Sequence, residues 1–277
     1  INIDHLGHER REVGGAVVAS GFAAAGSGAK TAVFCKLNPE EADLSERFDG
    51  IAADLYWKPS AHTCSIRNQY FTADKEKRQC TSLGVCDPFR FDELPDVKTA
   101  VYHFAGLVYG DFDGALLEEA SKHGKVALDV QCMLRHVEPD KSMAFHDWAE
   151  KKQYLPMIDY LKTDAAEAEI MTGLTDRAAA ARLLHEWGAK EVVITHNTEV
   201  LAYDGETIYT CPIKARNLSG RTGRGDTTFA GYITERQHAS VEESLRYCTA
   251  LVSLKMETPG PFRGTREDVL EYMKAFY

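Results

Sequence analysis

Short runs of apolar residues alternate with longer segments of helical spacing through the middle of the chain. Val101 to Phe104 is an apolar run, Gly114 to His123 places apolar residues at helical spacing, and Val126 to Val130 is a second apolar run. A short apolar run is typical of a buried strand, and the longer periodic segment is typical of an amphipathic helix. The order predicts one β-α-β unit.

The same alternation continues toward residue 195. Tyr160 and Leu161 lead into a helix at Ala165 to Thr172, a second helix is predicted at Ala178 to Trp187, and Val192 to Thr195 is a strand. Strands separated by helices in this way form a parallel sheet with right-handed crossovers and helices on both faces. Ligands of such sheets bind at the carboxyl ends of the strands.

The pattern changes after this unit. Val200 to Tyr203 and Thr207 to Ile213, joined by an Asp-Gly pair, predict a β-hairpin. A glycine-rich loop follows, and helical spacing then returns at Asp226 to Gln237, at Val241 to about Lys255 and at Arg266 to Phe276.

The front of the chain predicts a helix, a strand and a smaller β element. Val13 to Gly28 is rich in Ala and Gly and predicts a closely packed helix, and Thr31 to Leu37 predicts a strand. Apolar and polar residues alternate within 62–82, as in exposed strands. We expect this segment and about 5–13 to form a small β lid that projects from the main sheet. No linker or repeat interrupts the chain, so residues 1–277 predict a single domain.

Charge and cysteine usage narrow the function classes. The 42 acidic residues against 32 Lys and Arg give a net charge of −10, which disfavours nucleic acid and anionic membranes as partners. No run is long enough to span a membrane, and no signal peptide is visible at Ile1, where we expect a first strand that lacks its leading residues. The seven cysteines show no C-x-x-C pair and no zinc spacing, so we expect reduced, mostly buried thiols and a cytoplasmic protein.

The sharpest local feature is the segment Thr-Gly-Arg-Gly-Asp that ends at Asp226 and opens a helix. Gly223 and Gly225 let successive N–H groups converge on one spot, and the helix dipole adds positive charge there, so the segment predicts an anion site. Asp226 is then either an ordinary first-turn carboxylate or a base beside a phosphoryl group. The segment lacks the lysine of a P-loop, and Thr228 breaks the G-x-G-x-x-G pattern of a dinucleotide turn.

A second feature is the pair Asp164 and Glu167 after a predicted strand. Three residues apart at a helix start, they form an Asp version of the capping box, which is the more frequent cause of the pattern. The same carboxylates could hold Mg²⁺ at the carboxyl end of the strand. The two interpretations are compatible.

A third feature is Asp4, at the end of the first expected strand, together with Gly14 and Gly15 at a helix start. A strand-end carboxylate can accept hydrogen bonds from sugar hydroxyls, and paired glycines allow a ligand to approach the backbone. Each feature alone occurs in many proteins without such a function.

Taken in order, these features resemble the ribokinase-like (PfkB) family of carbohydrate and nucleoside kinases over nearly the whole chain. The segment around Asp4 resembles the first strand of the family with its substrate-binding Asp, and the paired glycines resemble its substrate turn. Lys-Thr-Asp-Ala-Ala-Glu is similar to the Asn-x-x-Glu segment, and Gly-Arg-Gly-Asp to Gly-Ala-Gly-Asp. Thr195 and Asn197 stand where the family has a nucleotide loop.

The resemblance implies a Rossmann-like, doubly wound core with a β lid over the sugar. It further implies Mg²⁺ and the transfer of the γ-phosphate of ATP to a primary hydroxyl of a sugar, polyol or nucleoside. Asp226 would be the base, and the N–H groups of Gly223, Arg224 and Gly225 would form the anion hole. The exposed edges of the lid could also pair in a homodimer.

Several positions depart from the family pattern. Gly220 replaces an Asp associated with monovalent cations, which argues against potassium activation, and Ala19 replaces a sugar-binding Asn. Asn197 and Val200 replace glycines of the nucleotide loop. Arg224 is either a surface residue of a backbone nest or a cation on the transferred phosphate.

These departures keep a second function open. A catalytically silent regulatory protein that binds a sugar or nucleotide on the same fold is the alternative to a kinase, and retention of Asp226 argues against it. A nicotinamide oxidoreductase is disfavoured because no G-x-G-x-x-G turn follows the first strand.

Overall fold

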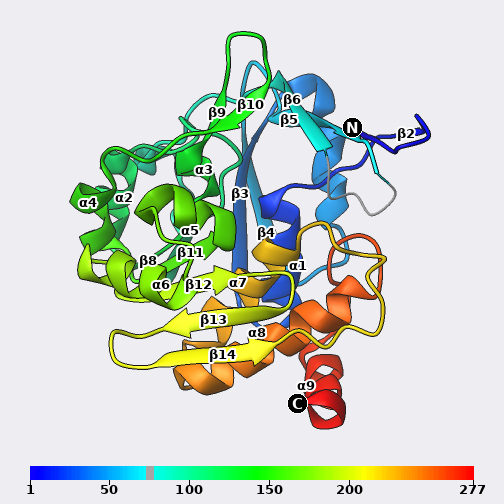
Figure 1. Cartoon of the computed structure of the whole chain (residues 1–277). Coiled ribbons are helices and arrows are strands. Elements are labelled where there is room, and N and C mark those ends of the chain that lie inside the picture. The colour runs from blue at the N-terminus through cyan, green and yellow to red at the C-terminus, as the bar shows by residue number, and fades with distance from the viewer. Residues whose placement is uncertain (73–77) are drawn as a thin grey trace.

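The main sheet of the computed structural model has six strands in the order β14-β13-β12-β11-β8-β7 (Figure 1). The structure describes residues 1–72 and 78–277. Strands β7, β8, β11 and β12 run parallel, and β13 and β14 are added by antiparallel pairing, which confirms the mostly parallel α/β sheet predicted from the sequence. The strands are β7 (Val101–Phe104), β8 (Lys125–Asp129), β11 (Tyr160–Asp164), β12 (Glu191–Thr195), β13 (Glu199–Tyr203) and β14 (Ile208–Pro212).

Helices cover both faces of this sheet because successive strand residues point to opposite sides. Leu161 and Ile194 belong to a core formed with α2 (Gly114–Ser121), α5 (Ala165–Thr172) and α6 (Arg177–Glu186). Tyr160 and Val193 belong to a second core formed with α7 (Arg224–Glu235) and α8 (Val241–Met256). The 3-10 segments are Pro39–Phe48, Phe91–Glu93 and Leu155–Met157. The remaining α-helices are the short α3 (Gln131–Leu134) and α4 (Lys151–Tyr154) and the last helix, α9 (Arg266–Phe276).

The helix α1 (Ala16–Gly26) and two parallel strands stand beside the main sheet. Strand β3 (Thr31–Leu37) pairs along its whole length with β4 (Ala53–Pro59), a strand that the sequence pattern did not predict. Val33 packs with residues of α1 in a small core of its own. The helix α1 also packs against α7, which places the start of α1 next to the glycine-rich segment.

A separate four-stranded sheet lies at the top of the molecule in Figure 1, in the order β2-β1-β5-β6. Its strands are β1 (Asn2–Ile3), β2 (Glu9–Arg10), β5 (Ser65–Tyr70) and β6 (Arg78–Gly84). We name this four-stranded sheet the lid. Of the segment 62–82 expected in the lid, residues 73–77 lie outside the described residues.

Two details of the lid differ from expectation. Asn2 and Ile3 pair with β2 and β5, so the first described strand belongs to the lid and not to the main sheet. In addition, the hairpin of β9 (Arg135–Val137) and β10 (Met143–Phe145), which the sequence did not predict, reaches the edge strand β6. Thr81 and Ser142 form a bridge there, so one of the two lid edges is covered within the chain.

Capping residues set both ends of α5. The helix α5 begins after Asp164, whose side chain accepts a hydrogen bond from the backbone, and ends at Gly173 with a φ of 74°. Among the described residues, none of the helices combines the length and apolar character needed to cross a membrane.

Candidate active site

The glycine-rich segment forms the open N-terminus of α7. Gly223 is the N-cap with a φ of 75°, a left-handed conformation that favours glycine. It also packs closely, because a Cβ atom on Gly223 would lie 3.0 Å from that of Ala19. The N–H groups of the first helical turn, which Arg224, Gly225 and Asp226 supply, have no acceptor within a helix and attract an anion.

Asp226 belongs to this first turn of α7, and its backbone contacts α1. The hydroxyl of Ser20 in α1 is 3.4 Å from the carbonyl oxygen of Asp226. The pKa of the Asp226 carboxyl is raised to about 6, first by burial and then by the nearby Asp129, against the opposing effects of Lys162 and Arg135. The carboxylate is therefore ionised at neutral pH and has a higher proton affinity than an ordinary Asp.

Lys162 lies beside the anion site in the middle of a carboxylate cluster. Its Nζ atom is 3.0 Å from Oδ2 of Asp129 on the neighbouring strand and 3.8 Å from Oε2 of Glu167. Burial opposes its charge, but the surrounding carboxylates outweigh burial and raise the pKa of Lys162. A Cβ atom on Gly225 would lie 3.0 Å from this Nζ atom, so the ammonium lies next to the N-terminus of α7.

Asp164 and Glu167 form the capping box that their spacing predicted. The Glu167 N–H donates to Asp164 Oδ1 at 2.8 Å, and the Asp164 N–H donates to Glu167 Oε2 at 2.7 Å. The pKa of Glu167 is raised to about 7, chiefly by burial and also by Asp164 and Asp129, against the opposing effect of Lys162. Their second predicted role, as metal ligands, stays a prediction.

Lys255 in α8 fixes the loop in front of the anion site. Its ammonium donates to the carbonyl oxygen of Gly220 at 2.5 Å and to that of Thr222. Burial lowers the pKa of Lys255 to about 8, and Asp226 partly offsets this effect. Gly220 has no room for a side chain, because a Cβ atom there would lie 2.0 Å from the carbonyl oxygen of Thr258.

The residues predicted for the nucleotide loop lie at the end of β12. Thr195 is buried, and its hydroxyl is 3.4 Å from the carbonyl oxygen of Thr163. The side chain of Arg221 is 3.5 Å from Oδ1 of Asn197, so this loop touches the segment that leads into the anion site. Val200 belongs to β13 and is fully buried in the core.

The residues predicted for the substrate lie at the lid and at the start of α1. Asp4 accepts hydrogen bonds from the N–H groups of Leu6 and His8, and the His8 ring lies 3.0 Å from its second oxygen. These contacts, first that with the His8 N–H, lower the pKa of Asp4. Gly15 is the N-cap of α1 with a φ of 83°, and a Cβ atom on Gly14 would meet no atom within 4 Å.

Two residues of this site were missed by sequence reasoning. The sequence pattern places Asp129 only near the end of an apolar run and Lys255 only at the end of a predicted helix, and it assigns neither residue to a site. A charged residue at the carboxyl end of a buried strand is the signal that could have found Asp129 and its partner Lys162, since parallel strands end at the same edge. No local pattern marks Lys255, because its partners lie 33 and 35 residues away.

Known proteins resemble this chain over most of its length. Residues 61–266 match the family described as pfkB family carbohydrate kinase. A pyrophosphate-dependent kinase in the ribokinase family, solved with a pyrophosphate analog and myo-inositol, is 29% identical with a TM-score of 0.89, and the match covers 98% of this chain and 96% of that one. The sulfate complex of a pyrophosphate-dependent kinase in the same family is 30% identical over 98% and 95% of the two chains, also with a TM-score of 0.89.

Two further relatives are more distant or match a shorter stretch. The ribokinase of Arabidopsis thaliana, solved with ribose and ATP, is 17% identical with a TM-score of 0.74 over 99% and 95% of the chains, which shows a shared fold. A cytidine kinase of Thermococcus kodakarensis is 36% identical over 85 residues, which span 30% of this chain and 31% of the cytidine kinase.

The matches confirm the ribokinase-like fold and the expected enzyme class, a kinase for a sugar, polyol or nucleoside. The matched residues include the carboxylate cluster and the N-terminus of α7 described above. The chain therefore belongs to the PfkB family of carbohydrate kinases.

Proposed function

We propose that this protein transfers a terminal phosphoryl group to a hydroxyl of a small sugar, polyol or nucleoside, with Asp226 as the general base. The observation that carries the proposal is the position of Asp226. Its carboxyl lies in the first turn of α7, beside the N–H groups of Gly223, Arg224 and Gly225, which would bind the phosphate. A base and an anion site are thus provided by the same helix end.

Asp226 would remove the proton of the acceptor hydroxyl as its oxygen attacks the phosphorus in line with the leaving group. With a pKa of about 6, the carboxylate is ionised at neutral pH and still basic enough to accept the proton. The N–H groups of the anion hole and the adjacent Lys162 would stabilise the negative charge that develops on the phosphoryl oxygens.

Asp164 and Glu167 are proposed to hold Mg²⁺ with the donor. Four carboxylates, those of Asp129, Asp164, Glu167 and Asp226, surround Lys162 and raise its pKa. This gathering of carboxylates fits a divalent cation, since Asp164 and Asp129 raise the pKa of Glu167 and Asp129 raises that of Asp226. When bound, Mg²⁺ neutralises charge on the donor phosphates.

The acceptor is proposed to be a small polyol or sugar that lies under the lid, near Asp4, Gly14 and Gly15. The relative solved with myo-inositol is 29% identical to this chain over nearly its full length. The ring hydroxyls of myo-inositol are secondary alcohols. The proposed acceptor hydroxyl is therefore not restricted to the primary alcohols expected from the sequence.

ATP is the donor that the family implies, and Thr195 with Asn197 would contact its nucleotide part. Pyrophosphate is a second candidate, because the two relatives at 29–30% identity are pyrophosphate-dependent kinases. Pyrophosphate has no base or ribose, so its affinity would come from positive charge and from hydrogen bonds to its phosphate groups. Lys162 and Lys255 beside the anion site supply such charge.

The test is a two-way assay of donors and acceptors. Purified protein is incubated with ATP or pyrophosphate and with a panel of pentoses, hexoses, inositol and nucleosides, and the phosphorylated acceptor is measured. We expect product with at least one polyol or sugar, and the preferred donor identifies the donor site. Thermal stabilisation by a sugar or nucleotide without product under any pair would instead support the silent regulatory protein.

We further propose that residues 1–277 form a single domain, that the protein is cytoplasmic, and that it forms a homodimer through the lid. The bridge between Thr81 and Ser142 covers the β6 edge, so the pairing edge of such a dimer would be β2. Analytical ultracentrifugation tests the dimer.

A further inference from the structure

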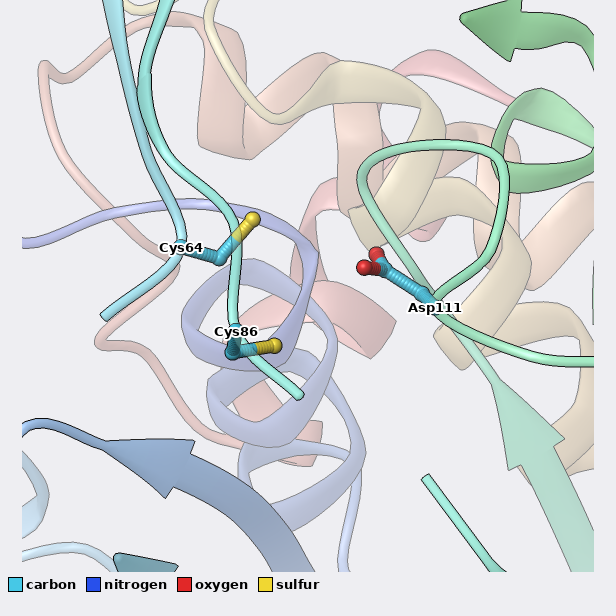
Figure 2. A group of neighbouring side chains, drawn as sticks. All are labelled: Cys64, Cys86 and Asp111. Carbon is cyan, nitrogen blue, oxygen red and sulfur yellow. The ribbon is translucent and has the colours of Figure 1, made fainter. Parts of the chain in front are cut away.

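Two cysteines and a carboxylate meet where the lid joins the main sheet. The ligand atoms of Cys64, Cys86 and Asp111 all lie within 4.8 Å of one another. Figure 2 shows the carboxylate of Asp111 pointing toward the side chains of Cys64 and Cys86. We name these three residues the thiol cluster.

The cluster is assembled by the topology and not by local spacing. Cys64 precedes β5 and Cys86 follows β6, and these antiparallel strands pair Ser65 with Gly84, which brings the two cysteines together across the base of the hairpin. Asp111 comes from the loop after β7, a strand of the main sheet. Both parts of the molecule therefore contribute to the cluster.

One oxygen of Asp111 has an unusual position. Its Oδ2 atom accepts hydrogen bonds from the N–H groups of Leu107 and Val108 at 2.6 and 3.0 Å. Its Oδ1 atom is buried and has no hydrogen-bond partner, and the residue as a whole is only 3% exposed. A buried carboxylate oxygen without a partner is unfavourable unless a cation or a proton satisfies it.

The chemistry of the three groups fits a metal ion. We propose that Cys64, Cys86 and Asp111 bind one Zn²⁺ ion, with a water molecule as the fourth ligand. Two thiolates and a carboxylate are ligands of a borderline-soft, tetrahedral cation and not of Mg²⁺, which prefers oxygen. The ion would also satisfy Oδ1 of Asp111.

Binding of the ion requires only a small movement of the three ligand atoms. Ligand atoms on a tetrahedral zinc lie about 3.3 to 3.8 Å apart, so atoms now within 4.8 Å would each approach the ion by less than about 1 Å. Binding would release the thiol protons to solvent. The ion would tie the base of the β5–β6 hairpin to the loop after β7, and so fix the lid on the sheet.

The experiment uses reduced, metal-free protein titrated with Co²⁺, which reports thiolate ligands through a charge-transfer absorption in the near ultraviolet. We expect one Co²⁺ per chain, displaced by Zn²⁺. Cys64→Ser, Cys86→Ser and Asp111→Asn should each weaken binding at least about tenfold. The matched control is Cys80→Ser, because Cys80 also lies in the lid but its thiol donates to Asn68 and not to the cluster.

A second readout guards against variants that fail to fold. In the wild-type protein, Zn²⁺ should slow alkylation of Cys64 and Cys86, measured by mass spectrometry, and leave Cys80 unchanged. The proposal is overturned if no thiolate-to-cobalt band forms, if folded Asp111→Asn binds as tightly as wild type, or if the two thiols form a disulfide and bind no metal. None of these readouts depends on kinase activity, so their failure would leave the proposed function untouched.

Discussion

The ammonium nitrogen of Lys162 lies 3.0 Å from Oδ2 of Asp129, and the two side chains are buried on adjacent parallel strands. Their pairing places a fixed positive charge at the carboxyl end of the sheet, next to Gly225 and the N-terminus of α7. The pair thus links the stability of the sheet to the electrostatics of the proposed phosphate site.

Lys162→Met should lower the free energy of unfolding by about 3 to 5 kcal/mol, because it leaves Asp129 buried without its cation. The control is Lys190→Met, since Lys190 pairs with Asp159 at a similar distance of 2.7 Å but its side chain is 62% exposed. That exposed pair should contribute less than about 1 kcal/mol. Urea unfolding of both variants measures the difference, and equal losses would contradict the structural role assigned to Lys162.

We expect kcat/KM to fall at both low and high pH. Asp226 must be ionised to accept a proton, so kcat/KM should fall as the pH decreases through about 6, its raised pKa. Lys255 must be protonated to hold two carbonyl groups, so the rate should also fall as the pH increases through about 8. A pH profile with an acid limb near 4 would show that Asp226 is not the titrating base.

Asp226 should also affect stability with a defined sign. Its pKa in the folded protein is raised above the usual value, so the folded state binds the proton more tightly than the unfolded state. The carboxyl therefore destabilises the protein progressively as the pH rises from about 4 through about 6. Thermal unfolding across this range should show Asp226→Asn to be less sensitive to pH than wild type.

Lys255→Met should reduce kcat/KM about 10- to 100-fold, because the loop from Gly220 to Thr222 loses the cation that fixes its carbonyl groups and so misplaces the anion site. The alkaline limb of the pH profile should disappear, and ammonium ions should restore part of the rate by entering the vacated space. Lys274→Met, an exposed lysine of α9, is the control. An unchanged rate and an unchanged alkaline limb in Lys255→Met would show that Lys255 does not fix the loop for catalysis.

Two glycine substitutions separate packing from substrate binding. Gly220→Ala should destabilise the protein by more than about 1 kcal/mol, because its Cβ would lie 2.0 Å from a backbone oxygen. Gly14→Ala should not alter stability, since nothing lies within 4 Å of its Cβ. If Gly14 lines the acceptor site, that variant should instead raise the KM for the acceptor; thermal unfolding and initial rates check both.

The main sheet was predictable because its strands and helices have strong periodicity and clear capping residues. The helix from Ala165 to Thr172 and the strand from Val101 to Phe104 have the ends that the sequence predicted. Strand β4 was missed because it pairs with β3 outside the main sheet and exposes many of its side chains. The β9–β10 hairpin was missed because each strand has only three residues.

The site could be predicted only where its residues are close in sequence. The capping box of Asp164 and Glu167 and the glycines before Asp226 are local patterns, and the structure contains both elements. The contacts of Lys255 and the meeting of Cys64 with Asp111 depend on how distant elements pack. No spacing rule detects such contacts, because the thiol cluster joins a lid hairpin to a loop of the main sheet.

The role of Asp226 as the general base is tested most directly by the turnover of Asp226→Asn. Turnover is measured with the preferred donor and acceptor and compared with donor binding by calorimetry. The substitution keeps the shape of the side chain and removes its basicity. We expect kcat to fall by about 10² to 10⁴ or more with nearly unchanged donor affinity. Turnover close to that of wild type would contradict this role.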